Sequence, residues 1–106
     1  MTVDQLVMLL HRKTAPLLLD VRTHAEYAAG HIPRSVHAPL AAIAGILAKR
    51  KAAKSDLLVL VCEHGPRAGL VRAYLRLRGY RKIVLLRGHM THWRQAGLPL
   101  EKSPGA

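Results

Sequence analysis

The sequence has little cysteine, few aromatic residues and few acidic side chains. One cysteine among 106 residues excludes an internal disulfide and is compatible with a reducing compartment. One tryptophan, three tyrosines and no phenylalanine leave few rings on which nucleic-acid bases could stack. The longest apolar run near the start, LVMLL, is too short for a signal-peptide core or a membrane span. We therefore expect a cytoplasmic protein that does not enter a membrane.

The scarcity of acidic residues leaves a strongly basic chain. There are 17 lysines and arginines against 6 aspartates and glutamates, which gives a formal net charge of +11. A field of this sign attracts small anions, acidic protein partners and nucleic acid. The basic residues are spread over several stretches and aromatic residues are rare, so we do not expect nucleic acid to be the partner.

The size and composition predict one folded domain. Half of the residues are hydrophobic and 22% are charged, which is typical of a globular protein and not of a disordered one. The chain has no internal repeat and no low-complexity linker. We expect one domain over residues 1–100, followed by a short flexible tail over residues 101–106.

Strand-like and helix-like stretches alternate along the chain. Three runs are apolar at successive positions, which predicts strands that are covered on both faces: 17–21, 57–61 and 83–86. Four stretches have helical spacing or helix-end signals: 2–13, 24–30, 40–51 and 67–79. The alternation predicts a three-layer α/β/α domain with a central, mostly parallel sheet.

Local signals support the four predicted helices. Thr2 and Gln5 have the spacing of a capping box, and Gly30 and Gly79 are natural helix ends. In the last of these helices, one arc is predicted to face the core through Leu70, Val71, Tyr74, Leu75 and Leu77. Trp93 is predicted to pack a final helical segment onto the core.

The carboxyl ends of the predicted strands bring chemically interesting residues to one edge. Ligands of open α/β sheets bind beyond the carboxyl ends of the strands. Asp20, Cys62 and Arg87 or Gly88 fall at such ends. Most single cysteines are inert packing residues, but this position favours a reactive role for Cys62.

The stretch CEHGPR, residues 62–67, predicts a tight loop between a strand and a helix that starts near Arg67. Inward backbone N–H groups and the helix N-terminus would stabilise an anion on the sulfur and lower the pKa of the Cys62 thiol. Arg67 would add a fixed positive charge and several donors for an oxyanion. Gly65 permits a close turn, whereas Pro66 has no N–H to offer. We expect Glu63 to face solvent.

Three stretches resemble one family. CEHGPRA is similar to the active-site loop of single-domain rhodaneses, C-x-x-G-x-R followed by a small residue, at Cys62, Gly65, Arg67 and Ala68. LLLDVRTHAEYAAGHIPRSVHAPL resembles the first signature of the family, and LRGHMTHWRQAGLPL resembles its closing segment. The stretches occur in family order and span nearly the whole chain. The resemblance implies the rhodanese-like α/β/α fold.

The resemblance also implies an activity. We expect from it a sulfurtransferase that moves a sulfane sulfur from a donor such as thiosulfate to a thiophilic acceptor such as cyanide or a thiol, through a persulfide on Cys62. Arg67 and the loop residues Glu63, His64, Gly65 and Ala68 would bind the donor and the persulfide. No metal or organic cofactor is implied.

Further residues shape the predicted pocket. Asp20 and Arg22 match positions that mainly shape the pocket in the family. Arg34 is expected at the rim of the pocket, at a position where the family commonly has glycine. Asp20 is expected to accept backbone hydrogen bonds, and Arg22 is expected to pair with Glu26 across a helix start.

Two other functions remain open from the sequence. Cysteine-dependent phosphatases of the same fold, and arsenate reductases, are one alternative, but phosphatases use C-x5-R and this chain has four residues between Cys62 and Arg67. A noncatalytic basic binding module is the other. We do not expect the seven histidines to form a metal site: His89 and His92 have helical spacing, yet no carboxylate or second cysteine completes a recognisable ligand set.

Overall fold

The computed structural model describes residues 1–12, 16–63 and 66–102. Within these described ranges, nine elements follow one another: α1 (Val3–Leu10), β1 (Leu17–Asp20), α2 (His24–Ala29), β2 (Val36–His37), α3 (Leu40–Lys49), β3 (Leu57–Val61), α4 (Pro66–Leu77), β4 (Lys82–Leu85) and α5 (His89–Gln95). The strands form one sheet in the order β2-β1-β3-β4, and every neighbouring pair is parallel. This is the α/β architecture that the alternation of strands and helices predicts.

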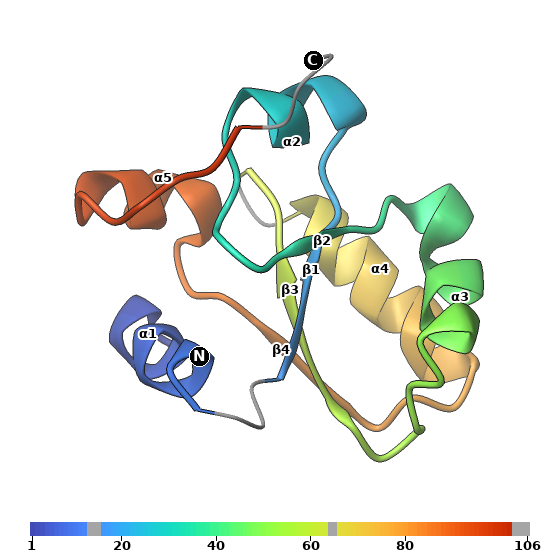
Figure 1. Ribbon diagram of the computed structural model, residues 1–106. Coiled ribbons are helices and arrows are strands. Elements are labelled where there is room, and N and C mark those ends of the chain that lie inside the picture. Colours follow the sequence, from blue (N-terminus) through green and yellow to red (C-terminus); the bar gives the residue numbers. More distant parts are fainter. Residues whose placement is uncertain (13–15, 64–65, 103–106) are drawn as a thin grey trace.

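Helices cover both faces of the sheet. Figure 1 shows α3 and α4 on one side of the strands and α1 and α5 on the other. The central strand β3 serves both cores, because Leu58 and Leu60 pack with α3 and α4 whereas Val59 and Val61 pack with α1 and α5. These four side chains are fully buried. Burial on both faces explains why the strand sequences are apolar at successive positions.

The predicted helix-end signals are present. Thr2 and Gln5 form the expected capping box at the start of α1. Gly30 ends α2, and Gly79 lies two residues after α4 with a left-handed φ of 96°.

In the part of the chain that the structure describes, no helix is both long enough and apolar enough to cross a bilayer.

The predicted core arc of α4 was too wide. Val71 and Leu75 are buried, but Leu70 and Leu77 are 69% and 89% exposed. A helix that lies against one sheet buries a single stripe, and in α4 this stripe is centred on Ala68, Val71 and Leu75. Leu70 and Leu77 lie on the solvent side of that stripe.

Two features escaped the sequence analysis. The strand β2 is only two residues long, Val36–His37, and pairs with the end of β1 through Leu19 and Asp20. Residue 101, at which the flexible tail was expected to begin, is held by the domain: the backbone of Glu101 exchanges two 2.9 Å hydrogen bonds with that of His31. Residues 103–106 of the expected tail lie outside the described residues.

Candidate active site

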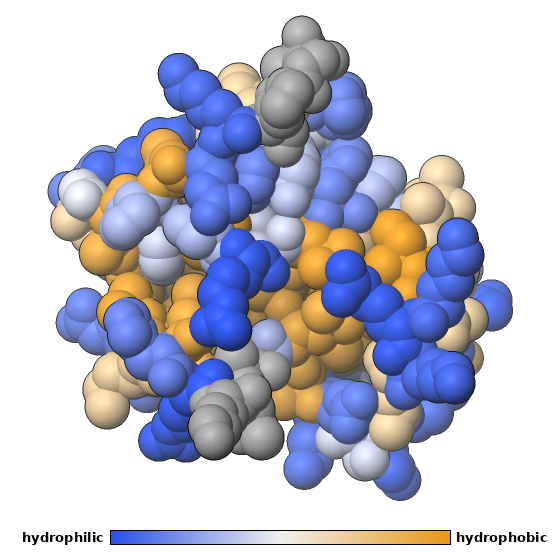
Figure 2. Space-filling view, viewed as in Figure 1, coloured by the Kyte–Doolittle hydropathy of each residue, from blue (hydrophilic) through white to orange (hydrophobic). Residues whose placement is uncertain are grey.

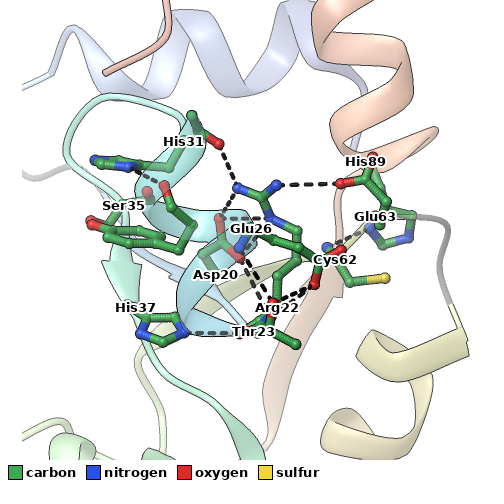
Figure 3. Close-up of polar contacts among 12 residues, drawn as sticks. Asp20, Arg22, Thr23, Glu26, His31, Ser35, His37, Cys62, Glu63 and His89 are labelled. Carbon is green, nitrogen blue, oxygen red and sulfur yellow. Dashed lines mark hydrogen bonds and ion pairs between the residues drawn. The ribbon is translucent and has the colours of Figure 1, made fainter. Parts of the chain in front are cut away.

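Cys62 is the first residue after β3, at the carboxyl edge of the sheet. Its relative exposure is 0%, so the side chain is enclosed by the protein. The backbone N–H of Cys62 donates to His89 Nδ1 at 3.1 Å, and its carbonyl oxygen accepts from the N–H of Met90 at 3.1 Å. Figure 3 shows the sulfur pointing away from Asp20 and Arg22 and toward α4. The start of α5 therefore holds the backbone from which the sulfur projects.

A buried ion pair lies beside Cys62. Asp20 and Arg22 are 0% and 1% exposed, and Arg22 Nη2 lies 2.8 Å from Asp20 Oδ2. Asp20 Oδ1 also accepts the backbone N–H of Arg22 at 3.0 Å, which confirms the expected backbone bond. Arg22 Nη2 donates further to the carbonyl of Gly30 at 2.7 Å. Burial opposes the charge of Arg22, but its bonds to Asp20 and Glu63 outweigh this and raise its pKa.

Glu63 does not face solvent, and that expectation was wrong. Its side chain is only 17% exposed and accepts hydrogen bonds from Arg22 Nη1 at 3.2 Å and from Arg94 Nη2 at 3.0 Å. A second bond joins Arg94 Nη1 to Glu63 Oε2. The bonds to Arg94 hold the pKa of Glu63 below its usual value, with a smaller contribution from Arg22. The two arginines draw the carboxylate inward because they supply the donors that water would otherwise provide.

The predicted pairing of Glu26 with Arg22 was wrong, because Glu26 pairs with Arg67. Arg67 Nη1 and Nη2 lie 2.7 Å and 3.0 Å from the two carboxylate oxygens of Glu26, a bidentate arrangement. This bond to Arg67 is the main reason why the pKa of Glu26 is lowered to about 2. The pKa of Arg67 is raised, chiefly by Glu26, with a smaller electrostatic contribution from Cys62. Arg67 is therefore within electrostatic reach of the Cys62 sulfur.

The charges around Cys62 are balanced. Asp20, Glu26 and Glu63 face Arg22, Arg67 and Arg94, and each carboxylate has at least one arginine within 3.2 Å. The large positive charge of the chain consequently lies outside this cluster. An anion that enters would compete with carboxylates for the arginines, because each guanidinium is already bonded.

The other residues that the sequence placed at the site differ in where they lie. Ala68 is fully buried in the first turn of α4, beside the cysteine loop. Arg34 is held elsewhere, because its guanidinium donates to the carbonyl of Leu10 at the end of α1. His64 and Gly65 lie outside the described residues. Gly88 lies between β4 and α5 and precedes the first residue of α5 with a left-handed φ of 76°.

Three site residues were missed or given another role by the sequence analysis. His89 was weighed only as a metal ligand, and Arg94 was not singled out. His37 on β2 is the third, and its Nε2 donates to the carbonyl of Arg22 at 2.8 Å. None of them follows a predicted strand directly, so strand ends gave no signal for them. Within residues 1–12, 16–63 and 66–102, no three metal-ligating side chains gather into a site.

The space-filling surface has mixed character on the side seen in Figure 2. Hydrophilic side chains form the rim, and apolar side chains show between them near the middle of the face. An apolar groove lies at α1 and the end of α5, lined by Val7, Leu10, Pro33, Trp93 and Leu98. Trp93 is 2% exposed and donates from Nε1 to the carbonyl of Pro99 at 2.9 Å, which confirms its packing role.

Comparisons with known proteins agree with this architecture. Residues 2–96 match the family model of the rhodanese-like domain. The chain is 35% identical to a sulfurtransferase of Allochromatium vinosum, over 84% of this chain and 81% of that protein. It is 34% identical to the thiosulfate sulfurtransferase GlpE of Pseudomonas fluorescens, over 89% of this chain and 84% of that protein. The chain therefore belongs to the rhodanese-like domain family.

A solved structure agrees as well. A rhodanese-like domain protein from Staphylococcus aureus superposes with a TM-score of 0.79 at 31% identity, over 97% of this chain and 96% of that one. Other curated relatives are longer, and the chain spans between 21% and 53% of three of them. The domain thus occurs both as a small protein and as one part of larger ones.

Proposed function

We propose that the protein is a sulfurtransferase that carries a sulfane sulfur as a persulfide on Cys62. The observation that supports this most is the place of the only cysteine: it follows the central strand, and its sulfur points toward α4 within electrostatic reach of Arg67. An anion on the sulfur would be stabilised there by Arg67 and by the N-terminal end of α4. The relatives named sulfurtransferase support the same activity.

The proposed reaction has two steps. The Cys62 thiol first loses its proton to water that enters with the donor as the groups around the sulfur move aside, and the thiolate attacks the outer sulfur of thiosulfate. The S–S bond of thiosulfate breaks, and sulfite leaves with the bonding electron pair. Cyanide or a thiolate then attacks the terminal sulfur of the persulfide, and the electron pair of the broken bond returns to Cys62. No external oxidant or reductant is needed.

Arg67 would bind the anionic donor only by exchanging partners. In the structure its guanidinium is bonded to Glu26, so thiosulfate must compete with a carboxylate for the same donors. The donor must also displace groups around Cys62, because the side chain has no exposed surface. We expect small donors to react faster than bulky thiol reagents for this reason.

The carboxylates of the site argue against a phosphatase. A phosphatase needs a protonated acid beside the cysteine to protonate the leaving alcohol. Arginine bonds lower the pKa values of Glu26 and Glu63, and Asp20 is bonded to Arg22. Glu26 and Glu63 are therefore held as anions, and both carboxylate oxygens of Asp20 accept hydrogen bonds from Arg22, so none of these three described carboxylates is placed to donate a proton. We rank a phosphatase or arsenate reductase below the sulfurtransferase, and a noncatalytic basic module below both.

The test is sulfur loading followed by discharge. The protein is incubated with thiosulfate and its intact mass is measured. Cyanide is then added, and the thiocyanate that forms is assayed. We expect a gain of one sulfur atom that cyanide reverses and that Cys62→Ser abolishes. Phosphate release from an aryl phosphate without sulfur loading would instead support a phosphatase.

A matched pair of arginine variants tests the donor site. Arg67 and Arg76 both lie on α4 and are both exposed, but only Arg67 is at the end near Cys62. Arg67→Gln should raise the KM for thiosulfate about fivefold, the loss expected for one exposed charge-assisted contact. Arg76→Gln should leave it unchanged. Equal effects of the two variants would show that only the overall charge matters.

A further inference from the structure

His89 has an uncommon backbone conformation and a buried imidazole ring. It is the first residue of α5, its φ is 48°, and it is only 7% exposed. The left-handed region is uncommon for residues that carry a side chain, and glycine adopts it without steric cost. The ring of His89 is directed at the start of the cysteine loop, where Nδ1 accepts the backbone N–H of Cys62 (Figure 3).

The hydrogen bond defines the state of the ring. An amide N–H can only donate, so Nδ1 of His89 must present a lone pair to Cys62. A neutral ring in this arrangement carries its proton on Nε2. A ring protonated on both nitrogens cannot accept the bond, and the Cys62 N–H would lose this partner.

Consecutive residues of α5 hold both polar groups of the Cys62 backbone. His89 accepts the N–H and Met90 donates to the carbonyl, each at 3.1 Å. The next residue, Thr91, donates from Oγ1 to the carbonyl of Glu63 at 3.4 Å. Bonds from α5 therefore hold the peptide planes on both sides of the Cys62 Cα, and the plane on the amino side is also held by the bond from the Val21 N–H to the Val61 carbonyl at 3.0 Å. The direction of the Cα–Cβ bond, and with it the position of the sulfur, depends on these bonds.

We propose that His89 is a positioning residue for Cys62, which sets the direction of the sulfur through the Cys62 N–H. The inference rests on the proposed sulfur transfer and adds a residue to it. The left-handed backbone of His89 aims the imidazole at the Cys62 N–H. A residue without an acceptor at this place would leave the Cys62 N–H to find another partner, and the start of the loop would shift.

Two substitutions separate the ring from the backbone. His89→Gly keeps the left-handed conformation accessible but removes the acceptor. His89→Asn also tolerates that conformation, and its side-chain oxygen can replace Nδ1 as the acceptor. His92→Asn is the control, because His92 lies on the same helix with an exposed side chain.

The readout is the single-turnover rate of sulfur loading from thiosulfate. We expect His89→Gly to load ten- to a hundredfold more slowly, the order of loss that a small displacement of a reacting atom produces. His89→Asn should remain within about threefold of the parent, and His92→Asn should match it. Equal rates of His89→Gly and the parent would overturn the proposal, and so would equal losses in the Gly and Asn variants.

A second measurement does not depend on sulfur transfer. Nitrogen-15 NMR of the parent should show the Nε2–H tautomer of His89 and slow hydrogen exchange at the Cys62 amide. Both signals tie the ring to the Cys62 backbone even if the Gly variant does not fold. A parent with these signals that gains no sulfur would refute the proposed function and leave the geometry standing. A parent with a protonated Nδ1 would overturn the positioning role itself.

Discussion

Removing the carboxylate of Glu26 should free Arg67 for an anionic donor. Glu26 binds both terminal nitrogens of Arg67, at 2.7 Å and 3.0 Å, so the guanidinium is occupied in the absence of substrate. Glu26→Gln keeps the shape of the side chain but removes its charge. If Glu26 and thiosulfate compete for Arg67, the variant should bind thiosulfate more tightly.

The size of the effect follows from the strength of the pair. A pKa of about 2 for Glu26, against a usual value of 4.5, corresponds at face value to about 3 kcal/mol. The Arg67 and Glu26 side chains are 44% and 31% exposed, and solvent screening reduces this to about 1 kcal/mol. That free energy corresponds to a KM for thiosulfate about fivefold lower than that of the parent.

Steady-state kinetics with thiosulfate and cyanide provide the assay. Asp4→Asn, an exposed position of α1, controls for the change in net charge and should leave the KM unchanged. In an Arg67→Gln background, Glu26→Gln should no longer change the KM, because the shared partner is gone. A KM that rises in Glu26→Gln would refute the reasoning, since Glu26 would then hold Arg67 in place for the donor.

The remaining predictions concern stability. The pKa of Glu26 is lower in the folded chain than in the unfolded one, so its contribution to the free energy of unfolding is complete above pH 4.5 and is lost as the pH falls toward 2. The free energies of unfolding in urea of the parent and of Glu26→Gln should therefore converge between pH 4.5 and 2, and should differ at neutral pH. Arg22→Leu should cost about 3–5 kcal/mol in urea unfolding, because it leaves the buried Asp20 carboxylate without its main partner; a loss below 1 kcal/mol would contradict this. Gly88→Ala should lower the melting temperature more than Gly97→Ala, since both have positive φ but only at Gly88 would a Cβ lie 2.3 Å from His92 Cβ; equal losses would contradict the steric argument.

Much of the fold could be predicted because it depends on neighbours in sequence. Successive apolar residues predict buried strands. Capping boxes and glycine ends predict helices, as at Thr2 and Gly30. The strand β2 gave no such signal, because two residues cannot show a period. The place of Cys62 after β3 was predictable for the same reason: the carboxyl ends of parallel strands share one edge.

The partners of the charged residues could not be predicted. The sequence gives the positions of the charged residues but not their partners. In the structure Arg22 binds Asp20 and also Glu63, which is 41 positions away. Glu26 binds Arg67, which is likewise 41 positions away. An arginine can reach any carboxylate that the fold brings close, and spacing in the sequence does not rank those candidates. Sequence rules for ion pairs apply within one helix, where the geometry is fixed in advance.

The amino-acid sequence by itself determined the layered domain and the edge at which its single thiol stands, because both follow from periodicity along a strand or a helix. Only the tertiary structure decided that Arg67 is occupied by Glu26, that Glu63 turns inward, and that His89 holds the Cys62 backbone. These contacts join segments that the sheet brings together. Their energies depend on distance and on exclusion of water, and neither quantity exists before the chain has folded.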